Sequence, residues 1–353
     1  MGRTTGTVEA GRLEWADVAK GISIILVVMM HSVLGTQETM QASGWLGPVV
    51  EFARPFRIPA FFMLAGFFFA GMLRRSWGEV LDRRVLHFVY FLMLWSVILM
   101  VVKGGFLALG SPAAALGWVV MSLIEPSGSL WFIHALALFA VVARLTATMP
   151  APAVLAAAAI LHLVAPETGW TALDEFASRY VFFIIGCRFA PMVAEFAADA
   201  RARTVLSLAI VMVTAMMIAM SVWPARVGFA GGAVATLPAF SLMLGLFGAL
   251  SLIIVAVHLA RFRFSRMLGA LGRKSLVIYL AFTIPMAATR MVLVKTGIIA
   301  DVGLVSLIVT LAAILVPLLM ELAARRAGAS FLFERPGWVR LRERRAAPRL
   351  QVA

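Results

Sequence analysis

The stretch KGISIILVVMMHS, Lys20–Ser32, decides the fold class. Ten residues stand between its lysine and its histidine, and eight of them are apolar while none is charged. A helix crosses a bilayer with about 20 predominantly apolar residues. The stretch therefore predicts a membrane-spanning helix, and the lysine and the histidine on it need an explanation.

The composition of the whole chain agrees with a membrane protein. Apolar residues make up 62% of the 353 residues and charged residues make up 14%. Soluble domains are about half apolar and about one quarter charged. The single cysteine, Cys187, excludes an internal disulfide and leaves no thiol-rich metal site. We expect a multi-pass protein of the cell (inner) membrane.

Hydropathy predicts ten spans, near residues 18–36, 48–73, 85–103, 129–146, 151–166, 179–194, 204–223, 231–257, 275–294 and 302–324. Lys and Arg concentrate in the cytoplasmic loops of membrane proteins. With both termini inside, 22 of the 31 Lys and Arg residues are cytoplasmic and three lie in outer loops, namely Lys103, Arg226 and Lys295. An eleventh span at 111–124 would reverse this charge distribution, so we interpret that segment as a re-entrant or interfacial helix on the outer face.

The predicted fold class is therefore all-α: a polytopic bundle of about ten transmembrane helices with both termini cytoplasmic. The net charge of +14 is mainly a topology signal, and it requires no nucleic acid. Residues 1–13 form a cytoplasmic N-terminal segment, residues 14–324 the membrane domain and residues 325–353 a basic cytoplasmic tail. Because aromatic residues are interleaved with its charges, we expect the tail to lie on the anionic inner leaflet.

Asp17, Lys20 and His31 share one face of the first predicted helix. At 100° per residue, Lys20 and His31 differ by about 20° around the axis, and His31 lies about 16 Å farther along it. Such a stripe must face the bundle interior or a wet cavity, because lipid disfavours each charge by several kcal/mol. Two interpretations of His31 stay open: a neutral residue hydrogen-bonded to a neighbouring helix, or a general base, since the unperturbed pKa of histidine is about 6.5.

A second polar cluster starts the next predicted span. Glu51, Arg54 and Arg57 follow one another at intervals of three, on adjoining faces of one helix end. One interpretation is an ion-paired helix start whose arginines extend to the interface, bent by Pro55 and Pro59. The other is an anion-binding or oxyanion-stabilising site at the mouth of a cavity.

Five segments occur in an order that resembles a known family. They are Asp17-x-x-Lys20 with His31, RIPAFFMLAGFF (57–68), GSLWFIHALALF (128–139), FFIIGCRFAP (182–191) and LGRKSLVIYLAF (271–282). This set is similar to the acyltransferase 3 family of integral-membrane acyltransferases. Lys20 stands where the family has arginine, as in a subgroup of fucose 4-O-acetylase-like proteins, and it keeps the charge without the bidentate fork.

The resemblance implies an O-acyltransferase that moves an acyl group, usually acetyl, from cytoplasmic acyl-CoA to a hydroxyl of an envelope or exported carbohydrate. His31 matches the family histidine taken to be the catalytic base, and Arg54 or Arg57 would polarise the thioester carbonyl or bind acidic acceptor sugars. Acetyl-CoA is a co-substrate, and we expect no permanently bound cofactor and no metal.

The phosphates of CoA need cations at the inner face. The residues that we expect at this co-substrate site are Asp17, Lys20, Arg74, Arg75, Trp131 and Arg273, and further candidate cations are Arg83, Arg84, Arg261, Arg263, Arg266 and Lys274. The positive-inside rule accounts for most of these charges equally well. Trp131 would line an acyl tunnel, although aromatic residues in membrane bundles also serve as packing or interface anchors.

The rival class is a transporter or flippase for a glycan or small anion. It would use the buried His31, Arg54 and Arg57 to bind a substrate or relay protons. Such a carrier predicts twofold internal symmetry with broken helices in both halves, whereas the polar residues here gather in the first two spans. A membrane scaffold without catalysis would leave the histidine-bearing stripe unexplained.

Overall fold

The computed structural model describes residues 14–102, 111–126, 128–223 and 237–341. Within these ranges the chain forms helices and no strand, which confirms the all-α prediction. Seven helices are long and apolar enough to cross a membrane, and the number rises to nine if each of two bent pairs is one span. The protein is thus a polytopic membrane protein, while the cytoplasmic location of its termini stays a prediction.

The seven long spans coincide with predicted spans. They are α1 (Glu14–Met40), α3 with η1 (Arg57–Phe69 and Ala70–Arg74), α4 to α5 (Trp77–Val80, η2 Leu81–Val85 and Leu86–Val102), η3 with α8 (Gly128–Leu130 and Trp131–Leu145), α12 (Thr204–Val222), α13 (Pro238–Leu259) and α17 (Val302–Arg326). The predicted fifth span is α9 (Ala151–Val164), which has only 14 residues. Within the part of the chain that the structure describes, the count is therefore seven to nine, against the ten predicted.

Two predicted spans are bent helix pairs. The segment 179–194 corresponds to α10 (Thr171–Arg188) and α11 (Ala190–Ala202), bent by 77°, and the segment 275–294 to α15 (Ser275–Ala281) and α16 (Thr283–Thr296), bent by 53°. Pro191 and Pro285 lie in the first turn of the second helix of each pair. Proline has no N–H to donate and is tolerated there, but it does not fit the interior of a straight helix.

The prediction of one helix over 48–73 is wrong at its start. Helix α2 (Gly47–Ala53) is separate, and the span begins only at Arg57. Pro55 lies in the gap, where it has no N–H to donate to the helical hydrogen-bond ladder, and Phe56 after it departs from helical geometry with φ −120°. Glu51 and Arg57 consequently belong to different helices.

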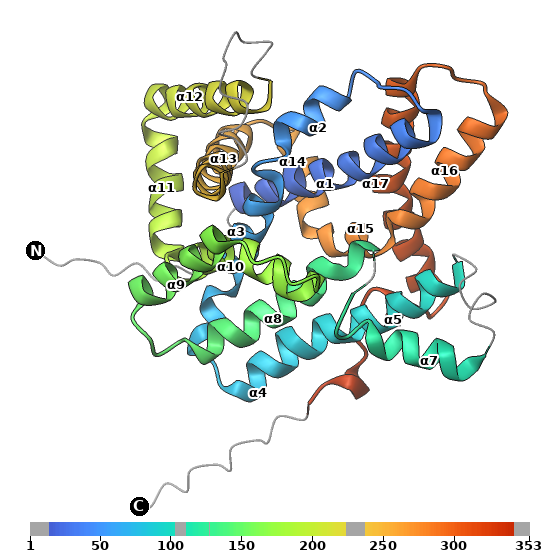
Figure 1. The fold of residues 1–353 in the computed structure, drawn as a ribbon, viewed down its shortest axis with the longest axis horizontal. Coiled ribbons are helices and arrows are strands. Elements are labelled where there is room, and N and C mark those ends of the chain that lie inside the picture. The colour runs from blue at the N-terminus through green and yellow to red at the C-terminus, as the bar shows by residue number, and fades with distance from the viewer. Residues whose placement is uncertain (1–13, 103–110, 127, 224–236, 342–353) are drawn as a thin grey trace, which may run out of the picture. The chain divides into compact units, whose positions relative to one another are not determined.

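The described chain divides into two compact units. Unit 1 holds residues up to Ala70 and Met149–Ala323, and unit 2 holds Gly71–Thr148 and the residues from Ala324 onward. In unit 1, α1 packs against α3, α13 and α14 (Ser265–Arg273), while α3 packs against α10. Helices α11, α12 and α13 form a group in contact with one another (Figure 1). The predicted boundaries at residues 13 and 324 rest on charge and hydropathy and stay predictions.

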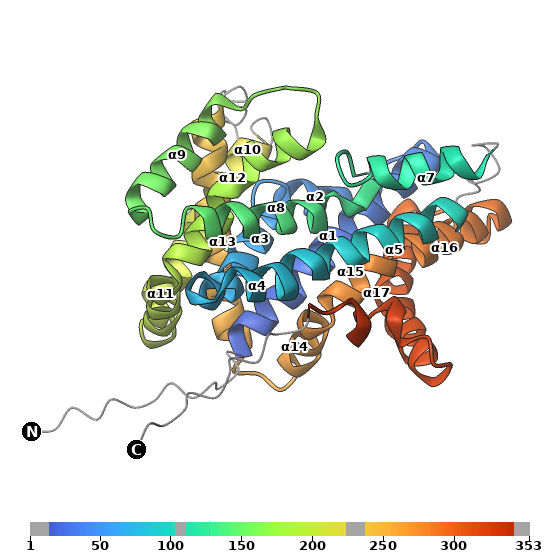
Figure 2. The same ribbon diagram turned by 90° about the horizontal axis from the view of Figure 1, so that it is seen from below.

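Unit 2 is built on α5 and α8, which run side by side (Figure 2). The predicted re-entrant or interfacial segment 111–124 contains α7 (Pro112–Met121), whose ten residues are too few to cross a bilayer. The first part of the predicted tail, with η5 (Ser330–Leu332) and η6 (Gly337–Val339), packs on this unit. Tyr90 Oη donates to the Phe331 carbonyl at 2.8 Å, and Trp95 Nε1 donates to the Leu332 carbonyl at 2.9 Å. These residues of the tail are held by protein, and contact with the leaflet stays a prediction.

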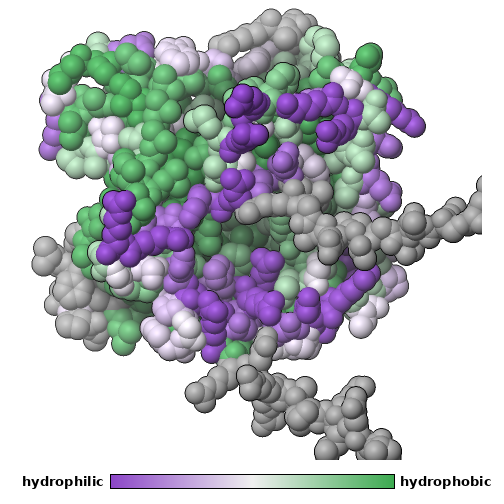
Figure 3. Space-filling model, turned by 180° about the vertical axis from the view of Figure 1, so that it is seen from behind, coloured by the Kyte–Doolittle hydropathy of each residue, from purple (hydrophilic) through white to green (hydrophobic). Residues whose placement is uncertain are grey.

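Large apolar side chains remain exposed along the outer helices. Val205, Met212 and Val213 on α12 are more than half exposed. Leu315 and Leu319 on α17 are also more than half exposed. Broad hydrophobic surface interrupted by hydrophilic patches is visible in Figure 3. In water such surface would promote aggregation, whereas lipid covers it at no cost.

Candidate functional site

Helix α1 carries the candidate residues of the first span. It runs unbroken from Glu14 to Met40, so Asp17, Lys20 and His31 lie on one side of it as predicted. Asp17 is only 5% exposed. Its carboxylate lies 3.9 Å from Lys20 Nζ and 3.7 Å from a guanidinium nitrogen of Arg273. The predicted residues Asp17, Lys20 and Arg273 therefore come together at the start of α1.

Close packing of two helices brings Arg273 to this position. A Cβ atom added to Gly21 of α1 would lie 2.0 Å from the Leu268 carbonyl oxygen, and one added to Gly272 would lie 1.9 Å from the Asp17 carbonyl oxygen. Helix α14 therefore crosses α1 with backbone against backbone, which only glycine permits. The crossing places the basic helix α14 against the acidic start of α1.

A pocket of about 630 Å³ opens beside this crossing. This volume lies in the range of small-molecule sites, about 300–1,000 Å³. Its walls include Glu14 and Asp17 of α1 and, from α14 and the loop before it, Arg261, Arg263, Arg266 and Arg273. Four of the candidate cations thus line one cavity. Lys274 instead pairs with Glu321 at 2.5 Å.

His31 lies farther along α1 and is half-buried. Its ring is 5.3 Å from the ring of Phe282, the residue between the end of α15 and the start of α16. The positive charge of Arg57 acts on its imidazole. No described residue hydrogen-bonds to His31, so the bond that the packing interpretation requires is absent from this part of the chain.

Arg57 and Arg54 occupy different environments. Arg57 begins α3, is 8% exposed and donates from Nη1 to the Val50 carbonyl at 3.0 Å, while its buried Nε has no partner in the described chain. Arg54 is exposed in the gap between helices. Glu51 accepts a hydrogen bond from Trp223 Nε1 at 2.7 Å. The predicted ion-paired cluster on one helix end is therefore wrong, because Glu51 and Arg57 lie on different helices and, within the described residues, Glu51 pairs with neither arginine.

Sequence reasoning missed Arg290 on α16. The guanidinium of Arg290 fills the space beside Gly35 of α1, because a Cβ atom added to Gly35 would lie 1.8 Å from Arg290 Nη1. Gly35 follows His31 by one helical turn on the same side of α1. A lone arginine within the predicted span 275–294 was the available signal, yet the sequence did not show which helix it would meet.

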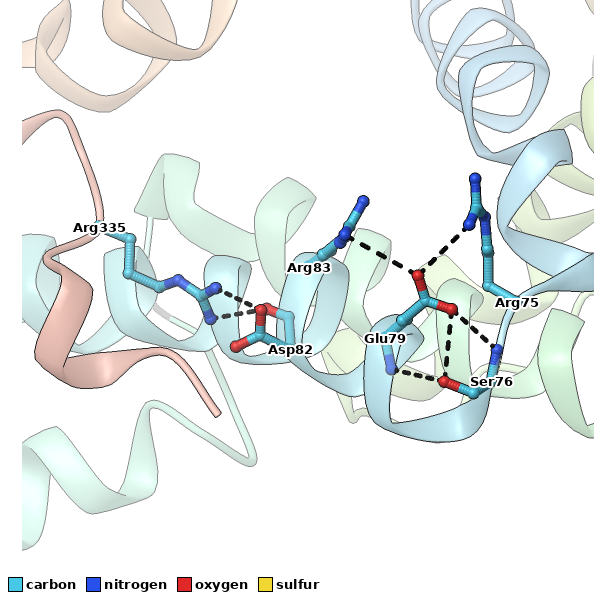
Figure 4. A network of polar contacts seen from close by, with 6 residues as sticks. All are labelled: Arg75, Ser76, Glu79, Asp82, Arg83 and Arg335. Carbon is cyan, nitrogen blue, oxygen red and sulfur yellow. Dashed lines mark hydrogen bonds and ion pairs between the residues drawn. The ribbon is translucent and has the colours of Figure 1, made fainter. Parts of the chain in front are cut away.

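The remaining predicted residues belong to unit 2. Arg74 ends η1 and is exposed, and Trp131 begins α8. Arg75 lies 3.5 Å from the Glu79 carboxylate, and Arg83 lies 3.8 Å from the same carboxylate. Glu79 also forms a capping box with Ser76 (Figure 4). Because a carboxylate already balances Arg75, this arginine is a weaker phosphate ligand than Arg263 and Arg266 of the pocket in unit 1, which have no ion pair within the described residues. The site on α1 is built from unit 1 alone.

The chain is similar in sequence to known proteins. A family model described as an acyltransferase domain matches residues 13–322. The chain is 24% identical over 206 residues to inner membrane protein YcfT of Escherichia coli, covering 50% of this chain and 56% of the relative. It is 27% identical over 179 residues to nodulation protein NolL of Mesorhizobium japonicum, covering 49% and 47%. The chain thus aligns with about half the length of these curated relatives, and no solved structure matches it significantly.

Proposed function

The chain belongs to the acyltransferase 3 family of integral-membrane acyltransferases, and from this premise we propose that it is an O-acyltransferase. The acyl group, in the simplest case acetyl, comes from acyl-CoA on the cytoplasmic side. The acceptor is a hydroxyl of an envelope or exported carbohydrate. We propose the inner membrane as its location, because its relative YcfT is an inner membrane protein.

The observation that carries this proposal is the continuity of α1 between two sites. Asp17 forms part of the wall of the arginine-lined pocket, and His31 follows on the same helix, 14 residues later. At 1.5 Å per residue the two are about 21 Å apart along the axis. A long, phosphate-bearing thioester suits this layout, because its phosphates need cations at one end and its reactive carbon needs a base at the other.

The cations in the pocket suit the nucleotide end of CoA. Guanidinium groups bind phosphate oxygens in a bidentate manner, and Arg261, Arg263, Arg266 and Arg273 line one cavity. The carboxylates of Glu14 and Asp17 on the same wall limit the excess of positive charge there to two. Asp17 also holds Arg273, so we assign it a positioning role rather than direct contact with phosphate.

The chemistry at the other end is acyl transfer to an alcohol. His31 takes the proton of the acceptor hydroxyl as the oxygen attacks the thioester carbon. The negative charge that develops on the carbonyl oxygen is stabilised by Arg57, whose charge acts on the same region. The carbon–sulfur bond then breaks, the thiolate takes a proton from the imidazolium, and an ester and CoA thiol result. We assign the exposed Arg54 a lesser role, in which its positive charge acts on Arg57.

The test follows labelled acetyl groups from acetyl-CoA into the envelope fraction of membranes that contain the wild type or His31→Gln. We expect the wild type to transfer label and His31→Gln to lose about 100-fold or more of the rate, the usual contribution of a general base. A matched control is His162→Gln, because His162 also lies in unit 1 and its ring donates to the Ser178 carbonyl at 2.7 Å. Both variants must be present in the membrane in the same amount as the wild type.

Two results would contradict the proposal. If the wild type transferred no label, the acetyltransferase activity would be refuted. If His31→Gln transferred label as fast as His162→Gln, His31 would not be the base.

A carrier for a glycan or small anion is the second candidate. The observation that favours it is the presence of two bent helix pairs, because broken helices form the substrate sites of many transporters. The break at Phe282 lies beside His31. Uptake of a labelled glycan or anion into vesicles, without incorporation of acetyl label, would support this candidate over acyl transfer.

A further inference from the structure

The region around His31 contains more positive charge than the described protein balances. Arg57 is more than nine-tenths buried, and the charged residues that act on it are two further cations, Arg54 and Arg179. Arg179 is paired with Glu175 at 2.8 Å, whereas no described carboxylate pairs with Arg57. A buried, unpaired cation in the membrane is unfavourable by several kcal/mol unless an anion compensates it.

Arg290 adds a second cation on the same side of α1. Its guanidinium fills the space above Gly35, one turn beyond His31 and about 6 Å farther along the axis. Within the described residues it has neither an ion pair nor a hydrogen bond. Since α16 begins directly after the break at Phe282, the bend between α15 and α16 directs this helix past the His31 region.

The nearby carboxylates on this side do not balance these arginines. Asp301 accepts from Trp45 Nε1 and from the backbone N–H of Leu304, and Glu51 accepts from Trp223. Glu38 lies two turns beyond His31 on α1, is exposed and pairs with no described arginine. The oxyanion of acyl transfer exists only during the reaction, so it does not neutralise the resting site.

We propose that the acceptor is itself anionic, and that Arg290 binds a carboxylate or phosphate on it while a neighbouring hydroxyl meets His31. This inference rests on the proposed acyl transfer and specifies its acceptor. Arg290 then selects the acceptor, and Arg57 acts on the thioester carbonyl. The spacing of one helical turn suits an acidic group and a hydroxyl on the same or adjacent sugar residues.

Gly35 provides an independent way to displace the arginine. In Gly35→Ala the new methyl group occupies the position of Nη1 and pushes away the far end of a flexible side chain, while alanine favours the helix. The charge of Arg290 remains in this variant. Gly35→Ala and Arg290→Gln should therefore produce the same defect, whereas a role of Arg290 in general folding would not make them alike.

The experiment has two parts and uses the full chain in membranes with labelled acetyl-CoA and alkali-treated, de-O-acylated envelope material as acceptor. First, the wild-type product is cleaved to the smallest labelled fragment, and its charge is read by mass spectrometry. Second, the transfer rate is measured against the amount of acceptor for Arg290→Gln, Gly35→Ala, Arg290→Lys and the control Lys295→Gln, an exposed cation in the last turn of the same helix.

We expect a fragment that carries a carboxylate or phosphate. Arg290→Gln and Gly35→Ala should need about tenfold or more acceptor for half-maximal rate, the loss expected when one charge-assisted contact is removed. Their half-saturating acetyl-CoA should stay unchanged, Arg290→Lys should recover part of the affinity, and Lys295→Gln should match the wild type.

A neutral fragment would overturn this inference and leave acyl transfer standing. Equal acceptor affinity in Arg290→Gln and Lys295→Gln would do the same. Complete absence of label transfer by wild-type protein that is present in the membrane would overturn the proposed function, and this inference with it.

Discussion

Gly21 of α1 and Gly272 of α14 face each other's helix across a contact that leaves no room for a side chain. A methyl group on Gly21 would lie 2.0 Å from the Leu268 carbonyl oxygen, and one on Gly272 would lie 1.9 Å from the Asp17 carbonyl oxygen. This reciprocal contact holds the arginine-bearing α14 against the start of α1. The second crossing, of α3 with α10 at Gly66 and Gly186, follows the same principle. Glycine pairs thus position the helices that carry the candidate site.

Gly272→Ala should destabilise the protein by more than about 3 kcal/mol, because a methyl group in contact with backbone cannot be accommodated by a side-chain shift and exceeds ordinary overpacking. The measurement is the midpoint of thermal aggregation in detergent. Gly78→Ala is the control, since a Cβ atom on Gly78 of α4 meets nothing within 4 Å. A Gly272→Ala protein as stable as Gly78→Ala would disprove the close crossing.

Arg263→Gln combined with Arg266→Gln should raise the half-saturating concentration of acetyl-CoA about tenfold or more, because two phosphate ligands are lost from the pocket. The effect should shrink at high salt, which screens the remaining charges. The measurement is the initial rate of label transfer against acetyl-CoA concentration. Arg75→Gln should change the half-saturating concentration of acetyl-CoA little, because Arg75 is paired with Glu79. A larger effect for Arg75→Gln would move the phosphate site to unit 2.

Arg57→Gln should lower the transfer rate at saturating substrates by about 100-fold or more, the loss seen when one oxyanion donor is removed. Arg54→Gln should lower it far less, because Arg54 is exposed and the negative charge develops near His31. Single-turnover rates with bound acetyl-CoA separate this effect from binding. Equal losses in the two variants would argue against oxyanion stabilisation by Arg57.

Arg335→Gln should release the segment Ser330–Leu341 from unit 2. The guanidinium of Arg335 lies 3.0 Å from the Asp82 carboxylate and donates to the Asp82 carbonyl at 2.6 Å, and its side chain is only 7% exposed (Figure 4). Removing one partner of this partly buried pair leaves an uncompensated charge and should destabilise more than the loss of a surface pair, which contributes about 0–1 kcal/mol.

Limited proteolysis within residues 330–341 measures that release. Glu334→Gln is the matched control, because its partner Arg325 is half exposed and surface pairs contribute about 0–1 kcal/mol. If the two variants were cleaved at the same rate, the Arg335–Asp82 contact would not be what holds the segment in place.

The sequence by itself determined the fold class, the family and the common face of Asp17, Lys20 and His31. A hydrophobic run long enough to cross a bilayer has few alternatives to a helix, because lipid offers no hydrogen-bond partner to the backbone polar groups. Spacing along one continuous helix is a local property, so the position of His31 relative to Lys20 followed from helical geometry alone.

Only the tertiary structure decided which residues of different helices meet. Local signals did not show that glycines would bring Arg273 to Asp17, that Pro55 would separate Glu51 from Arg57, or that Arg290 would reach Gly35. Each of these contacts joins segments that are distant in sequence or depends on a break between helices. They depend on how close two backbones come and where a helix bends, which side-chain packing across the whole bundle determines.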